Sequence, residues 1–164
     1  MAEEQALRPD VLFRTRVGAD FVDYNGHMND AAYAAVFSRS CDALMDRIGL
    51  DSASRNATGQ TLYTLKMMLH YFREVKEGAE LEVTCQLLEH DMKRMRVWFE
   101  MRVSGADAPC AASEQLLLSV SQIDGARAAP WGEVTRAALN KLTLQHATLA
   151  MPPEAGQGIR LKKG

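Results

Sequence analysis

The hydrophobic residues of this chain change from a helical spacing to a strand spacing, and this change limits the folds available to it. Between residues 29 and 49, large side chains recur at three- and four-residue steps, which is the spacing of one buried helix face. After residue 60, four apolar or alternating runs are separated by turn residues, as in consecutive strands. One strand, one helix and then four strands therefore predict an α+β fold.

The helix is the best-defined element of this pattern. Its buried stripe consists of Tyr33, Phe37, Cys41, Leu44 and Ile48. Asn29 or Asp30 can cap its first turn, and Gly49 is a suitable C-terminal stop. The first two turns are rich in alanine and leave almost no polar face, which is typical of a helix surrounded by protein.

The predicted strands cover residues 11–17, 61–72, 81–87, 95–103 and 110–122. Short turns between consecutive strands favour antiparallel neighbours, and a sheet curled around the single helix buries both elements. A short closing helix is expected at residues 131–142. We predict a single domain at residues 1–145, followed by a C-terminal tail at residues 146–164.

Composition excludes several classes of protein. The formal net charge of −2 leaves no basic footprint for nucleic acid, and no apolar stretch approaches the ~20 residues of a transmembrane helix. The acidic N-terminus lacks the order of a secretion signal. Three cysteines without a CxxC pair indicate free thiols in a reducing cytoplasm, and four histidines without ligand spacing predict no metal site. No cofactor is expected.

A short motif lies at the predicted junction between the first strand and the helix. Asp23, Gly26, His27, Asn29 and Tyr33 match the pattern Asp-x-x-Gly-His-x-Asn-x-x-x-Tyr. A second piece follows in the expected order, with Val75, Gly78, Leu81 and Val83. Together these residues resemble the 4-hydroxybenzoyl-CoA thioesterase-like group of hotdog proteins. The resemblance implies a hotdog fold, in which a curved five-stranded antiparallel sheet wraps one long helix, and it implies hydrolysis of an acyl-CoA thioester.

The motif contains the groups that thioester hydrolysis needs. Asp23 can act as general base or as nucleophile, and peptide N–H groups near the start of the helix can hold the oxyanion. Gly26 lets the backbone turn sharply. His27 is expected to orient the turn, and Asn29 to cap or position it. A purely structural interpretation, in which Asp23 and Asn25 only stabilise a turn, also fits the residues alone.

A narrower set of residues resembles the betainyl-CoA thioesterases of carnitine breakdown. This set comprises Tyr63, Thr64, His70 and residues 114–118 and 125–130. The resemblance implies that betainyl-CoA is hydrolysed to glycine betaine. Aromatic faces and a carboxylate recognise a trimethylammonium group, and the candidates are Tyr33, Phe37, Tyr63 and Glu114. The alternative is that these aromatic residues belong to the core and that Glu114 is an exposed strand-end residue.

The basic residues near predicted strand ends are candidates for binding the CoA phosphates. They are Arg73, Lys76, Arg94 and Arg96, although most such residues are only solvated surface. Hotdog relatives complete their clefts with a second subunit, so the resemblance implies a homodimer or a dimer of dimers.

Three rival functions remain open: another short, medium-chain or aromatic acyl-CoA as substrate, a non-catalytic acyl-CoA-binding module, and a hydratase. Proteins that resemble the hotdog hydratases use a different motif, Asp-x-Asn-Pro-x-His. That motif contains a proline, which is absent here, and its aspartate and histidine are one residue further apart than Asp23 and His27.

Overall fold

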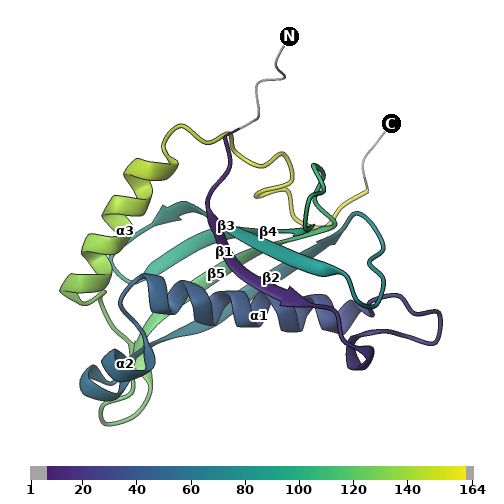
Figure 1. Cartoon of the computed structure of the whole chain (residues 1–164). Helices are drawn as coiled ribbons and strands as arrows, with labels where there is room; N and C mark the ends of the chain where they lie inside the picture. The colour runs from purple at the N-terminus through teal and green to yellow at the C-terminus, as the bar shows by residue number, and fades with distance from the viewer. Residues whose placement is uncertain (1–6, 162–164) are drawn as a thin grey trace.

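A computed structural model describes residues 7–161 and shows one long helix against one antiparallel sheet (Figure 1). The strands are β1 (Val11–Arg16), β2 (Gln60–Tyr71), β3 (Glu80–His90), β4 (Arg94–Val103), β5 (Ala111–Ser121) and β6 (Arg127–Ala128). The helices are the 3-10 turn η1 (Ala19–Phe21), α1 (Asp30–Arg47), α2 (Ser52–Thr58) and α3 (Glu133–His146).

The sheet order is β1-β3-β4-β5-β2, with the two-residue β6 paired to β5. All pairings are antiparallel. This confirms the predicted α+β hotdog fold with five principal strands. The order also makes β2 an edge strand, since only β5 pairs with it.

The first turn of α1 is fixed by the residue that precedes it. Asn29 is the N-cap, and its Oδ1 accepts a hydrogen bond of 2.9 Å from the N–H of Ala32. The predicted stripe is buried, and the ring of Phe37 lies 6.3 Å from that of Phe99 on β4. Gly49 has φ of +82°, the left-handed conformation expected of a residue that ends a helix.

Two details differ from the sequence-based predictions. Helix α2 was not predicted, because its sequence lacks a buried face; it is capped by Asp51, whose Oδ1 accepts from the N–H of Ser54 at 2.8 Å. The alanine-rich start of α1 is not surrounded within a single chain, since Ala31 is exposed and Ala34 and Ala35 are half-buried.

The outer face of the sheet, opposite α1, is partly covered by the C-terminal segment at residues 147–161, which bonds to Gln86 and Glu114 (Figure 1). Side chains alternate along β4, so Trp98 points away from the helix-facing Phe99. Trp98 is nevertheless buried, with 3% of its surface exposed. The predicted tail begins at the last residue of α3, and its described part packs on the sheet.

None of the helices formed by residues 7–161 has the length and apolar character needed to cross a membrane.

Candidate active site

The motif residues form a tight turn between η1 and α1. The Asp23 carboxylate closes it, because Oδ1 accepts from the N–H of Asn25 at 2.8 Å and from that of His27 at 3.2 Å. The Asp23 N–H donates to the carbonyl of His27 at 2.8 Å. Gly26 has φ of +74°, which a residue without Cβ adopts at no steric cost. Asp23 is exposed, and its Oδ2 takes no part in these bonds.

The turn is anchored to the segment that follows β2. The N–H of Met28 donates to the carbonyl of Val75 at 2.7 Å, and that of Glu77 donates to Gly26 at 3.2 Å. His27 and Lys76 form an isolated antiparallel bridge. The His27 Nε2 lies 3.7 Å from a carboxylate oxygen of Glu74. These contacts fix the backbone on both sides of Asp23.

The peptide N–H groups at the start of α1 differ in whether they have acceptors. The backbone N–H of Asn29 donates to the carbonyl of Phe21 at 2.9 Å, and the backbone N–H of Ala31 donates to Oδ1 of Asp30 at 2.9 Å. Ala32 donates to the Asn29 side chain. Among the described residues, no acceptor is recorded for the N–H of Asp30. That N–H lies at the positive end of the helix dipole, so it is the donor at this helix start that is available to an oxyanion.

A pocket of about 310 Å³ adjoins this helix start. It is lined by Met28, Asp30, Tyr33, Tyr71, Phe72, Arg73 and Glu74. The rings of Tyr33 and Tyr71 meet edge to face, with centroids 5.2 Å apart and planes at 89°. The Tyr71 hydroxyl donates to the carbonyl of Asp30 at 3.3 Å. Burial raises the pKa of the Tyr33 hydroxyl to about 12, so both rings remain neutral phenols at physiological pH.

The other residues predicted to hold the acyl group lie elsewhere. Phe37 is fully buried in the core, and Tyr63 lies near the opposite end of β2 from Tyr71. Glu114 points to the outer face, since it pairs across the sheet with Trp98 and Met68. Of the four predicted residues, only Tyr33 lines the pocket at the helix start.

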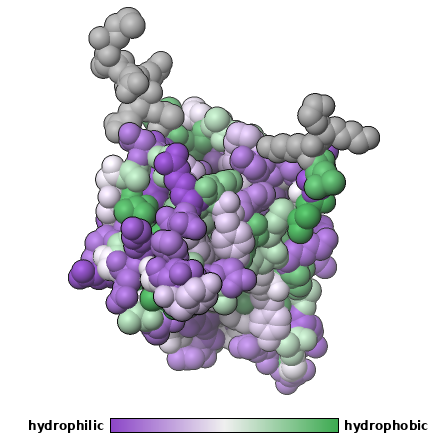
Figure 2. Space-filling view, turned by 90° about the vertical axis from the view of Figure 1, so that its right-hand side faces the viewer, coloured by the Kyte–Doolittle hydropathy of each residue, from purple (hydrophilic) through white to green (hydrophobic). Residues whose placement is uncertain are grey.

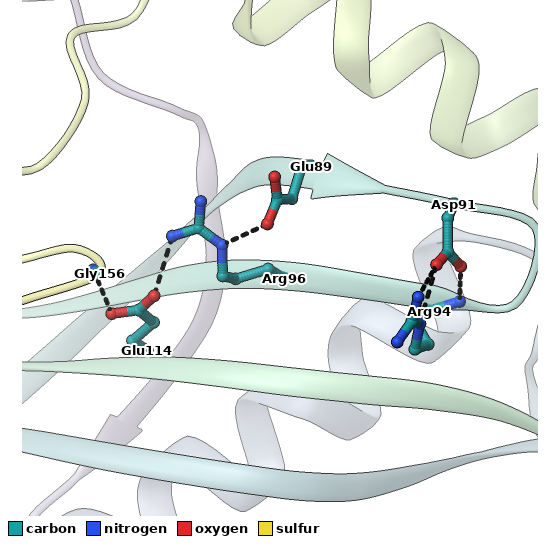
Figure 3. Close-up of polar contacts among 6 residues, drawn as sticks. All are labelled: Glu89, Asp91, Arg94, Arg96, Glu114 and Gly156. Carbon is teal, nitrogen blue, oxygen red and sulfur yellow. Dashed lines mark hydrogen bonds and ion pairs between the residues drawn. The ribbon is translucent and has the colours of Figure 1, made fainter. Parts of the chain in front are cut away.

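The four predicted CoA-binding cations fall into two groups. Arg94 bonds to Asp91, and Arg96 lies between Glu89 at 2.8 Å and Glu114 at 2.9 Å (Figure 3). Arg73 and Lys76 flank the turn, are exposed, and have no carboxylate within 4.0 Å among residues 7–161. Arg94 and Arg96 lie on β4, whereas Arg73 and Lys76 lie in the segment between β2 and β3, so the structure does not bring all four cations together.

Tyr71 and Glu74 were missed by the sequence analysis, which named the N–H groups at the start of the helix as oxyanion donors without singling out that of Asp30. Tyr71 carried a usable signal, because it is an aromatic residue at the end of the strand that leads into the second motif piece. The sequence could not show which N–H at the start of α1 lacks an acceptor, because this depends on how the neighbouring N–H groups are hydrogen-bonded.

A larger cleft of about 590 Å³ lies on the outer face, between the sheet and the C-terminal segment. Trp98 borders it, and the Nε1 of Trp98 is buried without a partner among the described residues. In Figure 2 the surface is mostly hydrophilic, and hydrophobic colour gathers towards the C-terminal segment.

Residues 7–161 contain no group of three or more His, Cys, Asp or Glu side chains placed to hold a metal ion.

Comparison with known proteins places the chain in a family. Residues 17–139 match the model of the thioesterase-like superfamily. A betainyl-CoA thioesterase from Pseudomonas aeruginosa is 45% identical over 149 residues, which cover 91% of this chain and 93% of that one. An L-carnitine dehydrogenase/betainyl-CoA thioesterase from Rhizobium meliloti is 34% identical over 96% of this chain, which spans 32% of that longer protein.

Solved structures agree in fold. A Pseudomonas putida KT2440 protein of known crystal structure has a TM-score of 0.82 and 40% identity, covering 96% of this chain and all of that one. A Staphylococcus aureus protein in complex with CoA has a TM-score of 0.85 at 22% identity, covering 96% of this chain and 99% of that one. The chain belongs to the thioesterase-like superfamily and is a thioester hydrolase.

Proposed function

We propose that this chain hydrolyses betainyl-CoA to glycine betaine and CoA, as a step of carnitine catabolism. The observation that carries the proposal is the 45% identity, over nearly the whole chain, to a betainyl-CoA thioesterase. Local geometry supports the proposal, because the exposed carboxylate of Asp23 and the Asp30 N–H, which has no acceptor among residues 7–161, lie at the two ends of one short loop.

In the proposed reaction, the thioester oxygen binds the Asp30 N–H. Asp23 either removes a proton from the attacking water or attacks the carbonyl carbon itself to form a mixed anhydride. In the first route the water oxygen bonds to the carbonyl carbon, the C–S bond breaks, and the proton taken up by Asp23 passes to the CoA sulfur. In the second route an Asp23 oxygen forms the new bond and the CoA thiolate leaves; water then hydrolyses the mixed anhydride, which releases the acid, restores Asp23 and supplies the proton for the thiolate. The helix N-terminus stabilises the negative oxygen of the intermediate, and such donors are typically worth about 10²–10³ in rate.

The other motif residues hold Asp23 and Asp30 in place. Gly26 permits the turn, and the His27 backbone bonds to both the N–H and the carboxylate of Asp23. Asn29 caps α1 with its Oδ1 and ties η1 to the helix with its Nδ2, which donates to the carbonyl of Phe21 at 3.2 Å. We assign His27 and Asn29 positioning roles on these contacts.

We assign the CoA phosphates to Arg73 and Lys76 rather than to all four predicted cations. Both are exposed beside the turn, whereas Arg94 and Arg96 already neutralise carboxylates. An arginine held between two carboxylates has little remaining charge to offer a phosphate.

We further propose that the enzyme is a homodimer, alone or paired into a dimer of dimers, joined through β2. This edge strand of 12 residues exposes Tyr63, Leu65, Met67 and Tyr71 at 39–52% of their surface. A long apolar edge invites pairing with another chain. Light scattering should detect a dimer, and Leu65→Lys should weaken it. A wild-type monomer that is active at assay concentration would contradict the proposal.

A cytoplasmic location fits the three buried cysteines, which are unpaired within the described chain. Cell fractionation with an antibody to the protein tests this point.

A panel of acyl-CoAs with thiol detection tests the substrate. Betainyl-CoA should exceed its neutral isostere, 3,3-dimethylbutyryl-CoA, by at least about tenfold in kcat/KM, because a desolvated cage of aromatic rings and carboxylates favours the cation. Preference for a neutral medium-chain or aromatic acyl-CoA would assign a different substrate to the same hydrolase.

A further inference from the structure

We propose that the pocket formed by Tyr33, Tyr71, Asp30 and Glu74 receives the trimethylammonium group of the substrate and sets acyl-group specificity. This inference rests on the proposed betainyl-CoA hydrolysis and names the residues responsible. It replaces Phe37, Tyr63 and Glu114, which the sequence alone had suggested, with Tyr71, Asp30 and Glu74.

The size of the acyl group limits where its cation can bind. In a betainyl thioester, one methylene separates the carbonyl carbon from the nitrogen, so these two atoms are roughly 2.5 Å apart. With the carbonyl oxygen on the Asp30 N–H, the ammonium must lie beside the first residue of α1. The pocket of about 310 Å³ meets this requirement, because Asp30 forms part of its wall.

The same limit excludes the other candidates. Tyr63 precedes Tyr71 by eight residues on β2, a separation of about 26 Å along an extended strand. Phe37 has no exposed surface, and Glu114 lies on the opposite face of the sheet. None of the three contacts a group held within one methylene of the Asp30 N–H.

The pocket has the chemistry that a quaternary ammonium requires. Such a group cannot donate hydrogen bonds, and it is held by aromatic faces and by carboxylate charge. The edge-to-face contact of Tyr33 and Tyr71 turns the two rings at right angles, which forms a corner rather than a flat stack. Tyr71 is 52% exposed in the single chain and lies on the edge strand through which we propose that the dimer forms, so the pocket would lie at the subunit boundary.

The carboxylates in the lining outnumber the cation. Asp30 and Glu74 contribute two negative charges, and Arg73 contributes one positive charge. Arg73 also borders the outer-face cleft, so its side chain has a second place to lie. The Tyr71 hydroxyl bonds to the Asp30 carbonyl at 3.3 Å, which brings that residue next to the ring. In keeping with this contact, burial and, second, the Asp30 carboxylate raise the pKa of Tyr71.

The test compares betainyl-CoA with 3,3-dimethylbutyryl-CoA in wild type and in variants of the pocket. Tyr71→Leu removes the aromatic face and keeps apolar bulk. Tyr71→Phe keeps the face and removes only the hydroxyl. Glu74→Gln removes the charge and keeps the shape. Tyr63→Leu is the matched control for a change at the proposed dimer edge, since it replaces a tyrosine by leucine on the same strand, about 26 Å from Tyr71 along the chain.

We expect Tyr71→Leu to lower the betainyl-to-isostere ratio of kcat/KM by about three- to thirtyfold, because only the cationic substrate gains from the negative face of the ring. Glu74→Gln should lower the ratio by about two- to threefold, and less at high salt, because this carboxylate is exposed. Tyr71→Phe and Tyr63→Leu should keep the wild-type ratio. Circular dichroism melts show which variants remain folded.

The outcomes separate the two proposals. A wild-type enzyme that prefers betainyl-CoA, with Tyr71→Leu and Glu74→Gln ratios within twofold of wild type, overturns this pocket assignment and leaves betainyl-CoA as the substrate. A wild-type enzyme with no preference between the two substrates overturns both. A ratio that falls equally in Tyr63→Leu also overturns the assignment, because the effect is then not local to the pocket.

Discussion

The carboxylates of Asp23 and Glu114 were both predicted from the sequence to be functional, but they differ in exposure and in how their oxygens are bonded. Asp23 is exposed in a loop and is held through one oxygen by backbone N–H groups of its own turn. Glu114 is 13% exposed, and both its oxygens are bonded, one to Arg96 and the other to the N–H of Gly156 at 2.8 Å (Figure 3). A carboxylate held by local backbone keeps an oxygen for chemistry, whereas one joined to an arginine and a distant segment stabilises the fold.

This contrast predicts that Asp23→Asn removes activity without loss of stability. The amide keeps the shape and the acceptor of the turn but loses both basicity and nucleophilicity. We expect kcat to fall by at least about 10²-fold, with an unchanged melting temperature. Asp20→Asn, an exposed aspartate three residues earlier, is the control and should retain activity. A folded Asp23→Asn enzyme with a third of wild-type kcat would exclude Asp23 from the mechanism.

Glu114→Gln should show the opposite behaviour. Removing one charge of a largely buried pair leaves Arg96 less compensated, so the free energy of unfolding should fall by about 2 kcal/mol, while kcat stays within twofold. Glu89→Gln is the matched control, because Glu89 bonds to the same arginine but is 66% exposed. Its loss should cost less than about 1 kcal/mol. Denaturant titration measures both, and a larger loss in Glu89→Gln would reverse the assignment.

The elements of the fold were predictable because their hydrophobic patterns are long. The stripe from Tyr33 to Ile48 and the alternation in β4 each include several large side chains, and these are buried as expected, except Val103 at the end of β4, which is half-buried. Helix α2 was missed because it buries none of its residues and depends on the Asp51 cap. Its location is set by local hydrogen bonds that periodicity does not report.

Only the part of the candidate site that is made by neighbours in sequence was predictable. The turn at residues 23–29 is made by neighbours in sequence, so its motif describes its geometry. Tyr71 meets Tyr33 only through the pairing of β2 with β5 and the packing of α1 on the sheet. The Glu114–Arg96 pair likewise arises from the β4–β5 register. Side chains brought together by register carry no local pattern from which their contacts can be predicted.

Two glycines test whether the turn is functional or only structural. Gly26 and Gly105 have φ of +74° and +81°, and a Cβ on either meets no atom within 4 Å. Alanine should therefore cost each about 1 kcal/mol in the free energy of unfolding, from backbone strain alone. Only Gly26→Ala should also lower kcat/KM, by about fivefold, because displacement of the catalytic group slows the reaction. Equal kcat/KM values in the two variants would remove Gly26 from the site.

The smallest expected effect concerns the contact between α3 and β3, where a histidine joins the helix to the sheet. His146 Nδ1 accepts a hydrogen bond of 3.0 Å from the N–H of Leu87, beside an irregularity in the β3–β4 pairing. Only the neutral ring can accept this bond. Burial and, second, the charge of Arg47 lower the pKa of His146 from its ordinary value.

The sign of the pH dependence follows from this lowered pKa. As pH falls below about 6.5, the unfolded chain binds a proton at residue 146 before the folded chain does, so the folded state loses stability. Above that pH the residue is neutral in both the folded and the unfolded chain, and its contribution to the free energy of unfolding is constant.

His146→Asn retains an acceptor near the Nδ1 position but does not titrate. The stability difference between wild type and His146→Asn should therefore shift against wild type between pH 7.5 and 5.5. The shift cannot exceed about 1.4 kcal/mol, the value for a folded state that binds no proton at residue 146 between these two pH values. Denaturant titrations at the two pH values measure it, and parallel pH profiles for the two proteins would show that this bond does not couple α3 to pH.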